Sequence, residues 1–374
     1  MTAIQTEKIF SRLLAAAAFC AGLATSAALA QVDIKVGAIQ PLSGPAATFG
    51  QSFTNAVPLA IEALKKQGVN MTVVVEDGAA NVPSSIAAYN KLVRVDNVPA
   101  IVHSVSPVVL TLGPMGERDK VVLINSMAGA PEIAKLGPYT FSTMPSYQIE
   151  GTDAAKFAYA KGARKVVGIY LDTATGKAAW DVFKPAFIAL GGQVVGEEAY
   201  SAGTTEFRAQ LTRAASANPD WIYLSAYAAE PGRILSQAGR MGLTGKIKFL
   251  GIVGAAQPET IEIGGSGAEG FMHANWPFDP ELGTAKMKEF GKAYMEKYKS
   301  LPTVYAATSY DALIAIGMAA KAGAKTGAEV QNYLEKKLGK IEGVTGEWSF
   351  DDEGMVVLAT RFVEVKDGKR VPVK

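Results

Sequence analysis

A serine next to a proline, shortly after an apolar run, offers the clearest binding chemistry in this sequence. The run Ala100 to His103 is followed by Ser106-Pro107. Serine as a cap and proline in the first turn are both typical of a helix start, where free N–H groups and the positive end of the helix dipole attract anions. The backbone amides around Ser106 and Val108, together with the Ser106 hydroxyl, could therefore hold a carboxylate. The alternative is that Ser106 only caps its helix.

No pattern typical of an enzyme accompanies this serine. The sequence contains no serine nucleophile elbow, no phosphate-binding loop and no paired-carboxylate signature. Its two histidines, His103 and His273, have no second metal-ligand residue at helical spacing. His103 could still approach a ligand, because it ends a strand beside Ser106. We therefore predict no catalytic residues, no metal site and no cofactor.

The N-terminus has the pattern of a secretory signal peptide. Lys8 and Arg12 precede an apolar run over 13–23, and small residues over 28–30 supply a cleavage position. This run is shorter than the roughly 20 residues that a membrane-spanning helix needs. The single cysteine, Cys20, lies inside the leader. We predict that residues 1–30 are removed near Ala30 and that the mature chain is periplasmic.

Length and charge favour two domains and a small-molecule partner. About 340 residues follow the leader, more than the roughly 100 to 200 that one domain usually contains. The chain has 37 Lys and Arg against 35 Asp and Glu, scattered along its length. Such a balance argues against nucleic acid as a partner.

Short apolar runs alternate with helical patterns, which predicts an α/β fold with doubly wound sheets. Breaks near 143–146 and 276–280 and an acidic turn over 351–354 divide the chain. We predict an N-terminal lobe of residues 31–144 plus 276–350 and a C-terminal lobe of residues 145–275 plus 351–374. The chain would then cross between the lobes three times and form a hinge. After the break at 276–280, no strand is expected before 346–350, and a final strand is expected over 355–365.

Several motifs in this order and spacing resemble one family. They are Asp33-Ile34-Lys35-Val36-Gly37 with Ser43-Gly44-Pro45, Ala130-Pro131-Glu132, Gly232-Arg233-Ile234-Leu235, and Gly346-Glu347-Trp348-Ser349-Phe350-Asp351. The whole mature chain resembles the Leu/Ile/Val-binding proteins of bacterial ABC importers, which are type I periplasmic binding proteins. The resemblance implies a monomeric receptor that closes on a small solute and delivers it to a membrane permease. A ligand-presenting partner of a signalling receptor is the alternative, because distant relatives with this fold are sensors.

The resemblance also implies which residues of the first lobe meet the ligand. Phe49 stands where the family has an aromatic wall, and Ser106 where it binds the ligand carboxylate. The loop Met127, Ala128 and Gly129 stands where the family offers a backbone carbonyl and a threonine hydroxyl. Here the threonine position is Gly129, so that hydroxyl is missing.

In the second lobe, the departures from the family are more informative. Tyr227 stands where a tyrosine closes the cleft, Thr175 replaces a second tyrosine, and Val253 replaces the glutamate that pairs with a ligand ammonium. A buried ammonium without a counter-charge is costly. Either the solute lacks an amino group or another acid substitutes, with Asp172 and Glu230 as candidates. We expect an apolar aromatic or aliphatic acid, with an amino acid still open. Trp276, at the second break, is a further candidate contact.

Overall fold

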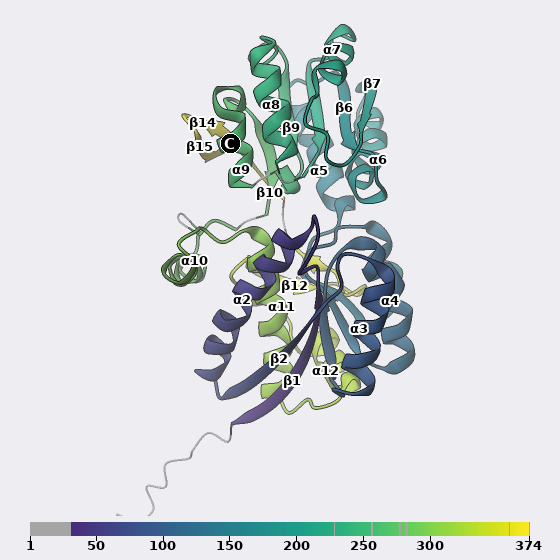
Figure 1. The fold of residues 1–374 in the computed structure, drawn as a ribbon, viewed down its shortest axis with the longest axis vertical. Helices are drawn as coiled ribbons and strands as arrows, with labels where there is room; N and C mark the ends of the chain where they lie inside the picture. The colour runs from purple at the N-terminus through teal and green to yellow at the C-terminus, as the bar shows by residue number, and fades with distance from the viewer. Residues whose placement is uncertain are drawn as a thin grey trace, which may run out of the picture.

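This computed structural model of the protein describes residues 31–373, apart from 228, 256, 277, 281–282 and 359. They form two lobes stacked along the long axis of the molecule and joined by thin passages of chain (Figure 1). The predicted signal peptide lies outside the described residues. Within the described part of the chain, no helix is long and apolar enough to cross a membrane.

A five-stranded parallel sheet, ordered β2-β1-β3-β4-β5, forms the centre of the first lobe. Its strands are β1 (Val32–Gln40), β2 (Val69–Asp77), β3 (Ala100–His103), β4 (Val122–Asn125) and β5 (Thr140–Ser142). The helices of this lobe are α2 (Ala47–Lys65), α3 (Val82–Arg94), α4 (Ser106–Asp119), α10 (Ala285–Tyr298), α11 (Val304–Lys321) and α12 (Gly327–Lys336), with a short 3₁₀ helix η1 (Pro131–Lys135).

Both faces of this sheet are buried, which explains the apolar runs without alternation. On β3, Ile101 belongs to the core formed with α3 and α4, whereas Val102 belongs to the core formed with α2 and α11. Successive side chains of a strand point to opposite faces, so a strand covered on both faces must be apolar at every position. The predicted doubly wound arrangement is therefore present in this lobe.

The second lobe has a seven-stranded sheet ordered β15-β14-β10-β9-β8-β6-β7. Its strands are β6 (Lys165–Leu171), β7 (Gln193–Tyr200), β8 (Trp221–Ser225), β9 (Lys248–Gly251), β10 (Met272–Asn275), β14 (Arg361–Lys366) and β15 (Lys369–Pro372). The strands β6 to β10 pair in parallel, and β14 and β15 add an antiparallel edge. Helices α5 (Tyr147–Ala160) and α6 (Ala174–Ala189) cover one face, and α7 (Arg208–Ser216) and α8 (Glu230–Arg240) the other. Three short helices lie between β9 and β10, namely η2 (Val253–Ala255), α9 (Pro258–Gly264) and η3 (Gly265–Ala268).

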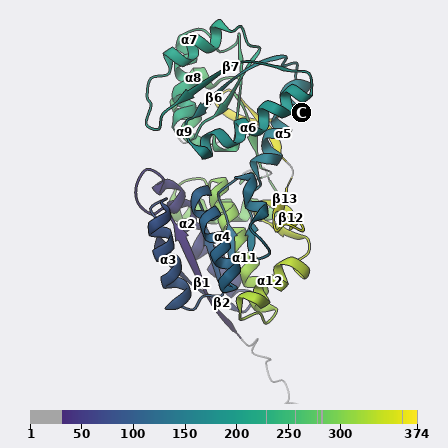
Figure 2. The ribbon, with the colours of Figure 1, turned by 90° about the vertical axis from the view of Figure 1, so that its right-hand side faces the viewer.

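The C-terminal strands differ from the sequence prediction. The final strand expected over 355–365 is two strands, because β13 (Val356–Val357) pairs with β12 (Gly346–Phe350) while β14 pairs with β10. Strand pairing therefore keeps residues up to Val357 with the first lobe, beyond the boundary predicted at 350. In Figure 2, β12 and β13 lie beside the lower lobe, which contains β1 and β2.

A further strand, β11 (Ile341–Gly343), forms where none was expected and pairs with β12. Three residues are too short to show a periodicity in sequence. The turn that follows β11 is held by the buried carboxylate of Asp311, which accepts hydrogen bonds from the N–H groups of Val344 at 2.9 Å and Thr345 at 3.0 Å. Asp311 also accepts from the Trp348 indole at 3.2 Å. These bonds fix the short sheet to α11.

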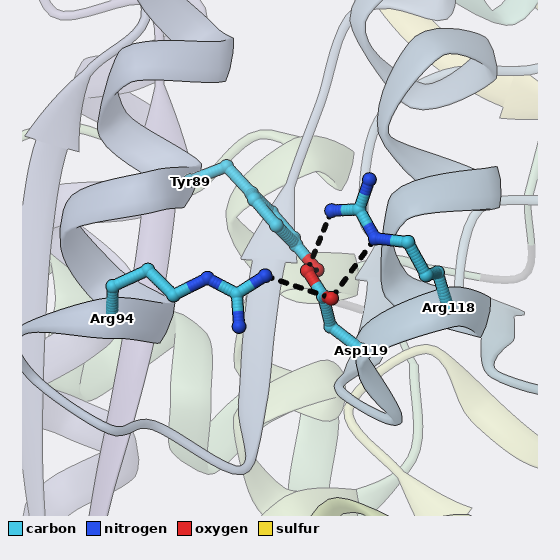
Figure 3. Close-up of polar contacts among 4 residues, drawn as sticks. All are labelled: Tyr89, Arg94, Arg118 and Asp119. Atoms are coloured by element: carbon cyan, nitrogen blue, oxygen red, sulfur yellow. Dashed lines mark hydrogen bonds and ion pairs between the residues drawn. The ribbon is translucent and has the colours of Figure 1, made fainter.

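A charged cluster joins α3 to α4 on the first lobe (Figure 3). The carboxylate of Asp119 accepts hydrogen bonds from Arg94 at 2.9 Å, from two nitrogens of Arg118 at 2.9 and 3.0 Å, and from the Tyr89 hydroxyl at 3.1 Å. The hydrogen bonds from Arg118, then those from Arg94 and Tyr89, hold the pKa of Asp119 at about 2. Such shared, charge-assisted contacts hold α4, which begins at Ser106, against α3.

Candidate functional site

The strand order locates the crevice in each lobe. In a doubly wound sheet, ligands bind beyond the carboxyl ends of the strands where the order reverses. In the first lobe this point lies between β1 and β3, and in the second between β6 and β8. Phe49 and Ser106 follow β1 and β3, and Tyr227 follows β8. Thr175 lies in α6 after β6, but its side chain is outside the described part of the structure. These four predicted residues thus follow the strands at the switch points, whereas the loop 127–129 follows β4 and Val253 follows β9.

Ser106 is the first residue of α4 and does not cap it. The cap position is Val105, whose backbone has φ 71° and ψ 114°, and no side chain caps this helix. A positive φ is strained for a β-branched residue. The Ser106 hydroxyl is buried and has no hydrogen-bond partner among the described residues. The capping alternative is therefore wrong, and the hydroxyl is available to a ligand.

Val108 does not contribute as predicted. Its backbone N–H donates to the carbonyl of Val105 at 2.9 Å, and its side chain packs in the core with α3. A tight first turn of this kind satisfies the amide inside the helix. Of the anion-binding groups predicted at this helix start, the Ser106 hydroxyl and the positive end of the helix dipole remain, and the Val108 amide does not.

The loop after β4 is organised by Asn125. Its side chain accepts from the N–H groups of Met127 at 3.2 Å and Ala128 at 2.8 Å, and donates to the carbonyl of Ala128 at 2.6 Å. Met127 and Ala128 are both buried. The hydrogen bonds to Asn125 therefore hold the loop in one conformation, and its apolar residues form one wall of the candidate site. A binding surface on a rigid scaffold has this property.

The missing threonine hydroxyl at Gly129 is explained by a tyrosine from the other lobe. The Gly129 carbonyl accepts from the backbone N–H of Tyr147 at 2.7 Å. A Cβ at position 129 would lie only 2.7 Å from the Tyr147 ring. The hydroxyls of Tyr147 and Tyr227 are hydrogen-bonded at 3.2 Å. Glycine is thus required here because Tyr147 occupies the space of a side chain.

Aromatic rings from the first lobe complete this wall. Phe49 packs edge-on against Tyr305, with ring centroids 5.1 Å apart and planes at 86°. Tyr305 lies in the first turn of α11 and is buried. Edge-to-face pairs of this kind are favourable beyond their buried area. Phe49 is half-buried, so it remains accessible at the edge of the site.

Val253 is fully buried, and its backbone N–H donates to Oε1 of Glu150 at 2.7 Å. Burial raises the pKa of Glu150 to about 7, against the opposing effect of this hydrogen bond. The acid that lies beside position 253 is therefore Glu150, which the sequence reasoning missed. An acid near a helix start is common because it suits the helix dipole, so its residue type did not set it apart. The usable signal was that α5 begins directly after the first passage between the lobes.

The two acids predicted as substitutes lie in other surroundings. Asp172 is exposed at the end of β6. Glu230 accepts a hydrogen bond from the Tyr200 hydroxyl at 2.7 Å, and burial raises the pKa of Glu230. Glu230 also lies next to Tyr227, because its backbone N–H donates to the Tyr227 carbonyl at 3.2 Å and its carboxylate accepts a hydrogen bond from the Tyr227 backbone. Neither acid has a described contact with Val253, so neither takes the place of the acid predicted at position 253.

Two further predicted residues are buried with unsatisfied polar atoms. His103 is fully buried, neither ring nitrogen has a partner among the described residues, and burial lowers the pKa of His103 to about 3. Trp276 is fully buried in the core that also contains Val253, and its indole nitrogen lacks a described partner. Among the residues that the structure describes, no group of three His, Cys, Asp or Glu side chains could hold a metal ion.

A comparison with known protein families shows to which family this chain belongs. A family profile described as a periplasmic binding protein matches residues 33–370. The chain belongs to the periplasmic binding proteins. Its relatives include the leucine-, isoleucine-, valine-, threonine- and alanine-binding protein of Pseudomonas aeruginosa, which is 28% identical over 354 residues, 92% of each chain.

Solved structures of similar proteins contain two kinds of ligand. The substrate-binding protein LivJ of Streptococcus pneumoniae, in complex with isoleucine, has a TM-score of 0.81 and 26% identity and covers 91% of this chain and 100% of its own. A solute-binding protein of an ABC transporter from Rhodopseudomonas palustris, in complex with 3,4-dihydroxybenzoic acid, has a TM-score of 0.82 and 26% identity over 91% and 96%. This periplasmic binding protein is thus of the branched-chain amino acid ABC transporter type, a family of solute-binding proteins and not of enzymes.

One cavity of this periplasmic binding protein lies beside the hinge. It has a volume of about 550 Å³ and is lined by residues of both lobes, among them Glu262, Asn275, Phe278, Val304 and Arg370. None of the residues predicted from the sequence lines it. Tyr147 of the second lobe contacts both Gly129 of the first lobe and Tyr227, so the predicted residues Gly129 and Tyr227 lie on either side of one buried ring.

Proposed function

We propose that this protein is a periplasmic receptor that binds a small apolar carboxylate between its lobes and delivers it to the permease of an ABC importer. The observation that carries the proposal is the buried, unpartnered hydroxyl of Ser106 at the first residue of α4. Buried polar groups nearly always have a partner, and a helix start favours an anionic one. A solute carboxylate would satisfy both.

The surrounding surface favours an aromatic or aliphatic acid over a polar solute. Met127, Ala128 and Val253 are apolar and buried, and Phe49 with Tyr227 adds aromatic surface. The relatives bound to isoleucine and to 3,4-dihydroxybenzoic acid support carboxylates of both kinds, so an amino acid is the second ligand class.

Binding would act through hinge closure. The first lobe takes the carboxylate, and the second brings Tyr227 over the solute, which excludes water and strengthens the polar contacts. The closed form would then dock on the permease as a monomer, after removal of residues 1–30 near Ala30.

A thermal-shift screen tests this proposal. The mature protein is heated with branched-chain amino acids, aromatic acids and short aliphatic acids, because a ligand that binds only the folded state raises its melting temperature. We expect stabilisation by at least one of these carboxylates and none by the matching amides. No shift with any carboxylate would contradict the proposed function.

A further inference from the structure

Glu150, near the start of α5, is a buried carboxylate of which the structure uses only one oxygen. The residue is fully buried, and Oε1 accepts a hydrogen bond from the backbone N–H of Val253 at 2.7 Å. Oε2 is also buried and has no hydrogen-bond partner among the described residues. Since most buried polar atoms in proteins have a partner, a donor group reaching this oxygen would be favoured.

Tyrosines from both lobes surround this carboxylate. Tyr147, Tyr223 and Tyr227 belong to the second lobe, and Tyr305 to the first. Burial raises the pKa of each tyrosine and the charge of Glu150 contributes to each increase, which places all four within electrostatic reach of the carboxylate. Glu150 therefore lies where the two lobes meet.

Within the described part of the chain, no basic side chain contributes to the pKa of Glu150. Burial raises the pKa of Glu150, and the backbone hydrogen bond from Val253 opposes this increase. The titratable groups that face it from the elements packed around it are the four tyrosines, which are neutral at physiological pH. A buried carboxylate without a counter-charge is costly, so a cation or hydroxyl that arrives with the solute gains from this site.

We propose that Glu150 determines which solutes are bound, by accepting a hydrogen bond from an ammonium or hydroxyl group on the same small carboxylate that Ser106 holds. This inference rests on the proposed function. It also accounts for Val253, because the carboxylate that is missing from the side chain at 253 is supplied to the same backbone position by α5. Repulsion between like charges keeps the solute's own carboxylate away from Glu150 and so fixes the orientation of the solute.

The competing explanation is that Glu150 only anchors the backbone at Val253. The isosteric variant Glu150→Gln separates the two, because a glutamine carbonyl can still accept from Val253 while an NH₂ donor replaces the second acceptor oxygen. Glu262→Gln is the matched control, since Glu262 is an exposed residue of α9 that lines the cavity beside the hinge. Glu150→Asp, which keeps the charge but withdraws it by one methylene, is a second variant if the glutamine form folds poorly.

Isothermal titration with two matched pairs of acids measures the effect. Leucine and 4-methylpentanoate differ in the ammonium, and 4-hydroxybenzoate and benzoate differ in one hydroxyl. In the wild type and in Glu262→Gln, we expect the donor-bearing member of one pair to bind about 10- to 100-fold more tightly than its parent acid. The pair that is discriminated identifies the donor as ammonium or hydroxyl.

In Glu150→Gln and in Glu150→Asp, we expect this ratio to fall by about tenfold or more, while the parent acid keeps its affinity. An unchanged ratio in both variants, or no discrimination within either pair by the wild type, overturns the inference and leaves the proposed function standing. Failure of all four acids to bind the wild type contradicts the proposed function, and this inference with it. A loss of discrimination in Glu262→Gln as well would place the solute in the cavity beside the hinge and also overturn the inference.

Discussion

Replacing Gly129 by alanine tests how the two lobes meet at the candidate site. The new Cβ would lie 2.7 to 2.8 Å from three atoms of the Tyr147 ring, whereas ordinary contacts begin at 3.4 Å. The ring must therefore move by about 0.7 Å, and it has little freedom to do so. Tyr147 is 4% exposed, its N–H is bound to the Gly129 carbonyl, and its hydroxyl is bound to Tyr227. Overpacking of this kind costs about 1 to 3 kcal/mol.

The backbone at Gly129 does not have a positive φ. The loss of stability in Gly129→Ala should therefore come from the contact with the Tyr147 ring alone. Urea unfolding of Gly129→Ala, Tyr147→Ala and the double variant measures the coupling between the two positions. We expect Gly129→Ala to lower the stability of the wild type by about 1 to 3 kcal/mol and to cost much less once Tyr147 is alanine.

Gly196→Ala is the matched control, because its Cβ would meet only the end of the Val167 side chain, at 3.3 and 3.7 Å. Its stability should stay within about 1 kcal/mol of the wild type. If Gly129→Ala costs as much without the Tyr147 ring as with it, the contact between the lobes does not explain the glycine.

Two further predictions concern buried acids. The pKa of Glu150 is raised from 4.5 to about 7, so the folded state holds a proton that the unfolded state has lost, and stability should fall as pH rises from about 4.5 to about 7 by at most about 3 kcal/mol. Urea midpoints across this range should show the fall in the wild type but not in Glu150→Gln; parallel profiles would refute it. The pKa of Asp119 is instead lowered, from 3.8 to about 2, so Asp119→Asn should cost about 1 to 3 kcal/mol at pH 7 and this difference should shrink as pH falls toward 2. A difference independent of pH would show that the charge of Asp119 does not stabilise α3 against α4.

The fold could be predicted because burial on both faces of a parallel sheet leaves a direct trace in sequence. The run Ala100 to His103 is apolar or buried at every position because helices cover both sides of β3. Ser106 and Tyr227 could be placed for a related reason, since each follows the carboxyl end of a strand next to the point where the strand order reverses. These features depend on residues close together in the chain.

The remaining features depend on contacts between distant segments. Ser106 matches the sequence pattern of a cap, and only the positive φ of Val105 moves the helix start by one residue. Glu150 lies 103 residues from Val253, and nothing in either segment indicates that they meet. The sequence predicts one strand where the structure has β13 and β14, because the residues between them carry no strong turn signal, although the two strands pair in different lobes.

The most direct test of the central claim is isothermal titration of a stabilising carboxylate into the wild type, Ser106→Ala and Ser216→Ala. Ser216 is exposed and its hydroxyl bonds to the carbonyl of Thr212 in its own helix, so it serves as the control. If Ser106 holds the solute carboxylate, its alanine variant should bind about 10- to 100-fold more weakly, while Ser216→Ala binds like the wild type. Equal affinity for all three proteins would contradict the carboxylate site between the lobes.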